Sequence, residues 1–327
     1  MNSNIYFYVK GGIFMKSLYN KITKIFVVFI IIVIITSYVT PTFAAVKSSK
    51  ISSILQLLEE KIKSKTDGNS TKKVTIPGSP GPGYNFSYNN LNTKLQKVYR
   101  YLYSKKSDMI DCNQIELVGL KNTVGSLTKS EINKVFMALI EDKPEFHYIC
   151  TRKIGSNIRI YNWSITSNYI KFTFKDKKMR EELASINSTA NTVIKNAKRQ
   201  TSTYQKIKYV HDWLCNNLTY KVNGAGIEGF ILKKGQCFTY SQMFQYIMNQ
   251  LDIDCIHIEG LARNSRLYGS HTWNQVYVNG QWYLIDVCWD DPETGFHYKY
   301  FLRGQDELNN RIINNKYPKL ARYGVFD

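Results

Sequence analysis

The sequence predicts an α+β protein in which a cysteine-bearing helix packs beside antiparallel strands. Apolar residues recur at helical spacing from Tyr240 to Leu251, directly after Cys237. The pair Asn279–Gly280 is a strong signal for a two-residue β-hairpin turn. Three segments with strand-like composition follow the helix, at residues 253–259, 271–278 and 281–289.

The predicted start of this helix places Cys237 where a thiolate is favoured. Unpaired backbone N–H groups and the helix dipole stabilise an anion at a helix N-terminus, and this position lowers the pKa of a cysteine. Gly235 supplies a small turn residue just before the thiol. We therefore predict that Cys237 is a nucleophile. The alternative is a small buried apolar residue, which is the commoner role of a lone cysteine.

His271 and Asp286 fall on the same face of the predicted hairpin. The two-residue turn sets the register and places Trp273 opposite Asp286, so His271 becomes a diagonal neighbour of Asp286 within side-chain reach. A shift of one residue would put the two on opposite faces. The spacing is consistent with a catalytic triad of Cys237 as nucleophile, His271 as base and Asp286 as the orienting carboxylate.

Acyl chemistry at such a triad also needs two hydrogen-bond donors for the oxyanion. The backbone N–H of Cys237, at the start of the helix, is a natural first donor. Gln236 and Tyr220 are candidates for the second donor, and the sequence does not choose between them.

The other polar residues of this region have plainer interpretations. His211 lies inside an amphipathic helix and is predicted to pack in the core, and His257 alternates with isoleucines in a strand. The run Asp290–Asp291–Pro292–Glu293 is compatible with a metal cluster, but turn residues after a strand explain it as well, and we prefer the turn. We expect no metal and no cofactor. Predicted packing or wall residues are Cys215, Cys255, Cys288, Trp273, Trp282 and Trp289.

Residues 1–44 have the pattern of a secretory signal peptide. Lysines precede an apolar run from Ile25 to Val39, and small residues follow it at 42–45. Met15 would be a more ordinary start than Met1. The run is shorter than the ~20 residues of a typical spanning helix, so cleavage is preferred to an uncleaved anchor, which would be the protein's membrane attachment. Either way we expect a secreted or cell-envelope-associated protein.

The chain is strongly basic, with a formal net charge of +19 that falls to about +15 without the four lysines of the signal. The excess is spread along the chain, and no nucleic-acid motif is present. We therefore expect an anionic envelope surface and a protein or peptide substrate, cell-wall associated or not, as partners, and no nucleic acid. The six cysteines are too sparse for a disulfide scaffold, although a disulfide that spares Cys237 stays open.

The pattern divides the remaining chain into three parts. Residues 45–88 read as a short helix, Val46 to Lys63, and a linker rich in Gly, Pro, Ser and Lys. Residues 89–195 read as a prefix domain of helices and a hairpin, and residues 196–327 as the catalytic domain. The predicted elements are helices at 91–102, 130–141 (capped by Thr128 or Ser130) and 178–214, and a hairpin pairing 158–163 with 169–174.

Three motifs together resemble the transglutaminase-like superfamily. They are Gly235–Gln236–Cys237 opening a helix, His271–Thr272–Trp273–Asn274–Gln275–Val276 on a strand, and Trp282–Tyr283–Leu284–Ile285–Asp286 on the next. The resemblance is firm from about residue 206 to 302 and looser from about 89 to 187, where it is to exported bacterial members. It implies a papain-like core, with Cys237, His271 and Asp286 on the nucleophile, base and third triad positions. Cys288 stands where many relatives carry threonine.

The resemblance does not choose the reaction. It implies an enzyme that forms an acyl-enzyme on amide bonds of proteins or envelope peptides and passes the acyl group to an amine or to water. A dedicated cysteine protease on the same scaffold is the close alternative. A non-catalytic, basic module that binds the cell envelope is the alternative from a different class.

Overall fold

The computed structural model describes residues 73–325 apart from 112, 153–158, 173–177, 223–225, 264–266 and 315. These residues belong to one compact unit, Thr71–Asp327. The predicted signal peptide (1–44), the predicted short helix (Val46 to Lys63) and Cys112 lie outside the described residues, as does the side chain of Cys150. Within the described part, no helix is both long and apolar enough to cross a membrane.

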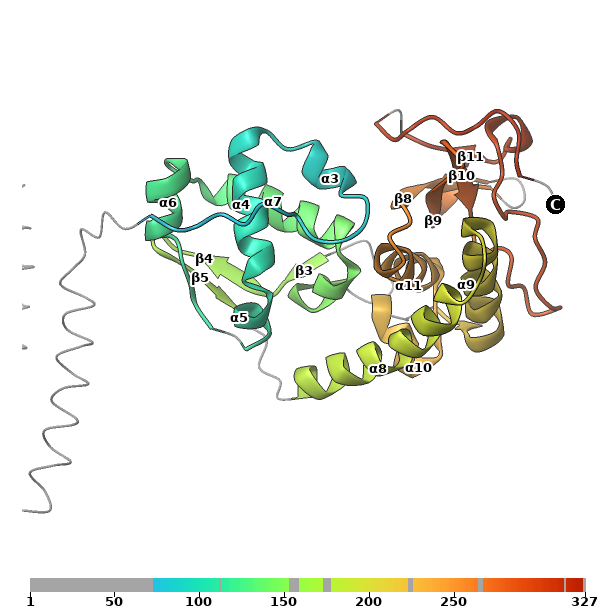
Figure 1. Ribbon diagram of the computed structural model, residues 1–327, viewed down its shortest axis with the longest axis horizontal. Coiled ribbons are helices and arrows are strands. Elements are labelled where there is room, and N and C mark those ends of the chain that lie inside the picture. The colour runs from blue at the N-terminus through green and yellow to red at the C-terminus, as the bar shows by residue number, and fades with distance from the viewer. Residues whose placement is uncertain are drawn as a thin grey trace, which may run out of the picture. The chain divides into compact units, whose positions relative to one another are not determined.

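The centre of the fold is the helix α11 (Cys237–Gln250), which packs on a four-stranded sheet, as predicted (Figure 1). The sheet has the strand order β10-β9-β8-β11, with every neighbouring pair antiparallel. Side chains of α11 are buried from Thr239 to Asn249, and Met243, Phe244 and Ile247 have no exposed surface. The bounds of the strands are β8 (Cys255–Ala262), β9 (Gly269–Val278), β10 (Gln281–Ile285) and β11 (Arg311–Ile312).

The β9–β10 hairpin has the predicted register. Gln281 pairs with Val278, and the pairing continues without a bulge to Ile285 and Asn274. The turn residues Asn279 and Gly280 both have positive φ, 49° and 86°, which is what a tight two-residue turn of this hand requires. The strand β10 ends one residue before Asp286, earlier than the predicted end at residue 289, because the chain turns there to begin a loop.

Two helices connect the N-terminal part to the core. The segment predicted as continuous helix from 178 to 214 is split into α8 (Lys178–Lys198) and α9 (Thr203–Asn217). Ser202 begins the second helix by accepting a hydrogen bond from the backbone N–H of Gln205, as an N-cap residue does. The apolar faces of both helices join the buried cluster that also holds the interior face of α11.

The prefix has its own buried cluster, built on α4 (Thr93–Ser104) and α7 (Lys129–Asp142). Of the two predicted caps for α7, the structure uses Thr128, which forms a capping box with Glu131. The remaining elements are α3 (Phe86–Asn89), α5 (Lys106–Ile110), β1 (Ile115–Glu116), α6 (Val118–Val124), η2 (Pro144–Ile149), β6 (Thr219–Tyr220), η3 (Gly226–Glu228), α10 (Gly229–Leu232), β7 (Lys234–Gly235) and η4 (Gln305–Glu307).

The hairpin predicted in the prefix is wrong in its first strand. The segment 158–163 is divided at Asn162: β3 (Arg159–Tyr161) pairs with β2 (Cys150–Arg152), and only β4 (Trp163–Ile165) pairs with β5 (Tyr169–Phe172). Asn162 directs its backbone N–H and its side-chain amide to the carbonyls of Ile149 and Tyr148. The backbone N–H of Asn162 therefore cannot also pair with a strand across the predicted hairpin, and the ladder is interrupted at this residue.

The described part of the predicted linker lies against the prefix helices. Val74 and Ile76 pack on the prefix cluster, and the carbonyl of Pro77 accepts a hydrogen bond of 2.7 Å from Arg100. The carbonyl of Pro82 accepts a hydrogen bond from the buried ammonium of Lys143. This proline-rich segment is therefore held against the prefix and is not a free linker, because its backbone carbonyls accept hydrogen bonds from the side chains of Arg100 and Lys143.

The prefix also contacts the nucleophile-bearing helix. The side-chain amides of Gln245 and Asn249 on α11 donate to the carbonyls of Glu141 and Asp142 at the end of α7, at 3.1 and 3.0 Å. These carbonyls belong to the last turn of a helix, which leaves its carbonyl groups without helical partners. The bonds fix the C-terminal half of α11, the end opposite Cys237.

Candidate active site

Cys237 is the first residue of α11, and its thiol is partly exposed. The N-cap residue, Gln236, makes no side-chain hydrogen bond to the helix, so the first backbone N–H groups remain available to an anion. The parallel bridge between Tyr220 and Gly235 fixes the chain just before the helix. A Cβ on Gly235 would lie 2.2 Å from the hydroxyl oxygen of Thr239, so the glycine allows the backbone to pass close to Thr239 just before α11 begins.

The side chains of His271 and Asp286 meet beside the start of this helix. Nε2 of His271 lies 2.7 Å from Oδ2 of Asp286, and the two side chains are 8% and 1% exposed. Oδ1 of Asp286 accepts a hydrogen bond of 3.1 Å from the backbone N–H of Trp289. The carboxylate is therefore held on both oxygens, and it occupies Nε2 of the imidazole, which leaves Nδ1 for another partner.

That other partner is the thiol of Cys237, which forms a hydrogen bond with His271. Burial alone would raise the pKa of the thiol, but the hydrogen bond and charge of His271 outweigh it, and the pKa of Cys237 is lowered. Burial alone would lower the pKa of His271, but the charge and hydrogen bond of Asp286 raise it to about 9. The arrangement favours a thiolate beside an imidazolium at neutral pH.

The structure thus brings together the three residues that the sequence predicted. Tyr220, one candidate for the second oxyanion donor, lines the cleft. The pKa of its phenol is raised by burial, by the charge of Cys288 and by the charge of Cys237, so Tyr220 lies close enough to Cys237 to interact with a thiolate there. Gln236, the other candidate, precedes Cys237 in the chain, and neither of these two residues is among those that line the cleft. The electrostatic interaction of Tyr220 with Cys237 favours Tyr220 as the side-chain donor beside the N–H of Cys237.

A cleft of about 1280 Å³ opens in front of His271. Its aromatic wall includes Trp289, whose ring stacks on the imidazole of His271 with centroids 4.6 Å apart. The ring of Trp273 stacks on the same imidazole at 5.9 Å. Both tryptophans therefore pack in the core and beside the site, as predicted. Charged side chains of both signs line the cleft: Arg263, Lys299, Asp291 and Glu293.

The sequence reasoning missed Arg311, whose guanidinium binds Oδ2 of Asp286 in the protein interior. Nothing near Arg311 in the sequence marks it, because its partner is 25 positions away and the contact depends on the pairing of β11 with β8. The only available signal was an arginine in a short strand-like segment after the last motif. It is too weak to predict an ion pair.

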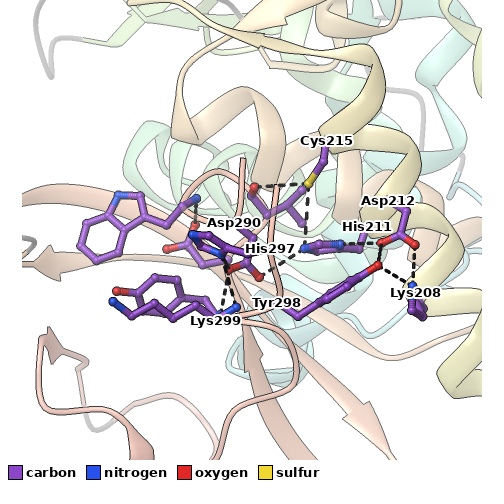
Figure 2. A network of polar contacts seen from close by, with 12 residues as sticks. Lys208, His211, Asp212, Cys215, Asp290, His297, Tyr298 and Lys299 are labelled. Atoms are coloured by element: carbon purple, nitrogen blue, oxygen red, sulfur yellow. Dashed lines mark hydrogen bonds and ion pairs between the residues drawn. The ribbon is translucent and has the colours of Figure 1, made fainter. Parts of the chain in front are cut away.

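Asp290 is a buried centre of hydrogen bonds, although its sequence context predicts an ordinary turn (Figure 2). Its carboxylate meets Nε2 of His211 at 3.2 Å and Nδ1 of His297 at 3.0 Å, and accepts from the backbone N–H of Tyr300 at 2.8 Å. His211 is buried, as predicted, but it is bonded to Asp290 and to Asp212. These bonds fix the loop at 291–300, which forms one side of the cleft.

The cysteines other than Cys237 behave as packing residues in the described part of the chain. Cys215, Cys255 and Cys288 are free thiols, and burial raises the pKa of each.

His257 bonds through Nδ1 to the hydroxyl of Ser241 at 2.6 Å, which anchors α11 to β8. Across the described residues, no group of three or more His, Cys, Asp and Glu side chains is arranged to hold a metal ion.

Comparison with known proteins agrees with this core. Residues 188–287 match the sequence model of the transglutaminase-like superfamily. The matched segment contains Cys237, His271 and Asp286, so this part of the chain is similar to the superfamily, and the chain has the mixed helix and antiparallel-sheet core expected of it.

Among curated proteins, the chain is similar to the kyphoscoliosis peptidases of Mus musculus and Homo sapiens. The identities are 23% over 159 residues and 24% over 102 residues. These stretches cover 41% and 26% of this chain, but only 24% and 15% of the relatives. The chain therefore spans a quarter or less of the length of these two proteins.

Two solved structures overlap with the chain in part. One is a candidate cysteine protease from Cytophaga hutchinsonii, with 18% identity and a TM-score of 0.30 over 34% of this chain and 40% of that chain. The other is described as a TGase, with 18% identity and a TM-score of 0.31 over 42% of this chain and 46% of that chain.

Proposed function

We propose that this chain is an exported cysteine enzyme that acts on amide bonds of proteins or envelope peptides through an acyl-enzyme on Cys237. The observation that carries the proposal is the buried contact of 2.7 Å between His271 and Asp286, beside Cys237 at the start of α11, whose pKa the hydrogen bond and charge of His271 lower. A thiolate beside an imidazolium is ready to attack a carbonyl, and it has next to it the acid that the leaving amine needs.

In the first half-reaction the sulfur of Cys237 attacks the amide carbonyl carbon, and the carbonyl oxygen becomes an oxyanion. The backbone N–H of Cys237 donates a hydrogen bond to it, with the phenol of Tyr220 as the proposed second donor. When the oxyanion collapses, the C–N bond breaks and His271 gives its proton to the leaving amine. A thioester on Cys237 remains, and Asp286 holds the now neutral imidazole in place.

In the second half-reaction His271 removes a proton from the acceptor as the acceptor attacks the thioester. The carbon–sulfur bond breaks, and the thiolate of Cys237 and the imidazolium are restored. An amine acceptor gives cross-linking, and water gives hydrolysis. The outcome depends on how well the bound substrate excludes water.

The cleft supports a peptide-like substrate. Its aromatic wall beside His271 and its charges of both signs suit a chain of mixed side chains better than a uniformly anionic ligand. Its volume of about 1280 Å³ exceeds that of a typical small-molecule pocket, so it can hold an acyl donor and an acceptor together. The apolar run at the N-terminus supports an extracytoplasmic substrate.

A dedicated cysteine protease is the second candidate. The observation that favours it is the similarity of part of the chain to the kyphoscoliosis peptidases of mouse and human. In that case water is the normal acceptor, and the substrate is cleaved within its backbone. A non-catalytic, envelope-binding module is the third candidate, favoured by the basic composition of the chain.

The three candidates separate in one experiment on the purified chain without residues 1–44. It is incubated with a glutamine-containing peptide and a fluorescent primary amine, and intact-mass spectrometry follows both peptide and protein. The proposal predicts an acyl adduct on Cys237 together with release of ammonia and either amine incorporation or deamidation. Internal cleavage of the peptide identifies the protease. If Cys237→Ala and the wild type give the same products, the site is not catalytic and the binding module replaces the proposal.

A further inference from the structure

Arg311 lies on a part of the chain that the superfamily match does not include. The match ends at residue 287, whereas β11 pairs with the edge of the sheet through Arg311 opposite Ala262 and Ile312 opposite Leu261. Gly260, on the neighbouring β8, permits this close pairing, because a Cβ there would lie 2.8 Å from the carbonyl oxygen of Ile312. The added strand therefore delivers a cation to a site whose other parts come from the matched core.

The guanidinium of Arg311 is bound where it can act on the base of the site. Its Nη2 donates to Oδ2 of Asp286, the same oxygen that His271 contacts through Nε2, and the side chains of Arg311 and Asp286 are each 1% exposed. The other guanidinium nitrogens, Nε and Nη1, have no hydrogen-bond partner among the described residues. The carboxylate of Asp286 is thus the anchor that the structure gives to this cation.

Aromatic rings enclose the guanidinium and keep water from it. Its central carbon lies 4.0 Å from the ring centroid of Trp289, and 4.9 Å from those of Trp273 and Tyr300. The two tryptophans are the ones that stack on His271. Charges interact more strongly in such an enclosed environment than in water, so a change of charge at Arg311 acts on Asp286 and His271 with little screening.

We propose that Arg311 is a positioning residue that holds the Asp286 carboxylate against His271 and, by sharing its charge, limits the basicity of the imidazole. This assignment rests on the proposed function of the Cys237–His271–Asp286 site. A carboxylate shared between two cations stabilises each of them less than it would stabilise one alone. The effect keeps the imidazolium able to release its proton to a leaving amine, which an imidazole of very high pKa does poorly.

Several charged or titratable groups face His271 and Arg311, and together they set the protonation of His271. Cys237 contacts His271 from α11, and Asp286 and Arg311 face it from the end of β10 and from β11. Asp290, Tyr300 and Cys288 also face Arg311. Cys288 has its pKa raised by burial and stays neutral. The cation of Arg311 is therefore the positive charge that opposes protonation of His271.

The test uses alkylation of Cys237 by iodoacetamide across pH, read by mass spectrometry, which needs no knowledge of the substrate. In a thiolate–imidazolium pair the rate rises in two steps, and the upper step marks deprotonation of His271. Arg311→Met is expected to move that upper step to higher pH by about one pH unit, because a cation near the imidazole is lost. Arg311→Lys keeps the charge and is expected to keep the wild-type profile.

Arg322 offers a matched control. It too binds a carboxylate, that of Asp306 at 2.8 Å, and lies over a ring, that of Tyr323 at 5.1 Å, but its side chain is 74% exposed. Arg322→Met is expected to leave both steps unchanged. A folded Arg311→Met variant whose upper step stays in place or moves to lower pH overturns the assignment, and so does an Arg311→Lys variant that shifts like Arg311→Met.

Two further readouts keep the assignment testable. If Arg311→Met does not fold, ¹⁵N spectra of the wild type replace it: the Arg311 side-chain resonances should titrate with the midpoint of the upper step, and their failure to titrate overturns the assignment. If the wild type itself shows one ordinary thiol titration, the proposed function fails as well. Two steps in the wild type without an effect of Arg311→Met refute the role of Arg311 alone.

Discussion

Nε2 of His271 and Oδ2 of Asp286 are 2.7 Å apart in the protein interior, although 15 residues separate them in the chain. The hairpin between them is what makes this possible: its register puts both side chains on one face beside the start of α11. The carboxylate holds one nitrogen of the imidazole, so that the other nitrogen faces the Cys237 thiol.

Asp286→Asn should lower the basicity of His271, because it removes the charge that raises the pKa of the imidazole to about 9. The basic limb of the pH profile of kcat/KM should move to lower pH, and kcat should fall by roughly 10²–10⁴-fold. Steady-state kinetics from pH 5 to 10 provide the check. Asp306→Asn, at an exposed ion pair, serves as the control. An unchanged basic limb in a folded Asp286→Asn variant would contradict this role.

Tyr220→Phe should lower kcat by about 10-fold or more with little change in KM, because a phenol that stabilises the oxyanion acts in the transition state. The motivation is the position of Tyr220 on the cleft near Cys237. Gln236→Ala should have a smaller effect, since Gln236 is not among the groups that act on the thiol of Cys237. Equal losses in the two variants, or a change confined to KM, would remove Tyr220 from the oxyanion site.

Asp290→Ala should destabilise the fold by about 3 kcal/mol, because it leaves the buried His211 without one of its carboxylate partners. Urea unfolding followed by tryptophan fluorescence measures the change in the free energy of unfolding. Asp306→Ala removes a carboxylate from an exposed pair and should cost less than about 1 kcal/mol. Similar losses for the two variants would show that Asp290 is the simple turn residue that the sequence suggested.

Asp142 predicts a dependence of stability on pH. Burial raises the pKa of its carboxyl to about 7, against the backbone hydrogen bonds from Ser87 and Tyr88. Between pH about 4 and about 7 the folded chain holds a proton that the unfolded chain has released, so the free energy of unfolding falls as the pH rises through this window. Urea unfolding at pH 5 and pH 8 should show a smaller fall for Asp142→Asn than for the wild type. An identical fall in both would contradict the assignment.

The parts of the fold that could be predicted from the sequence depend on short-range rules. The register of the β9–β10 hairpin follows from Asn279–Gly280, and the start of α11 follows from apolar spacing after Cys237. The sequence marks Gly235 as a turn residue, and the structure adds the reason: with no side chain at this position, there is room for the side chain of Thr239.

The parts that could not be predicted depend on partners distant in the chain. Arg311 meets Asp286 only because β11 joins the edge of β8, and a two-residue strand leaves almost no periodic signal. Asp290 reads as a turn residue until His211 and His297 are brought to it from a helix and a loop. Asn162 divides a segment that alternates like one strand, because its amide groups bond to backbone carbonyls outside the predicted pair.

The most direct test of the central claim is the pH dependence of Cys237 alkylation by iodoacetamide, resolved for each cysteine by mass spectrometry. We predict that Cys237 reacts well below the ordinary thiol pKa of ~8.5, faster than Cys215, Cys255 and Cys288, and that His271→Ala removes this advantage. Reaction of Cys237 with an ordinary thiol profile, unchanged by His271→Ala, would contradict the claim that the site holds an activated nucleophile.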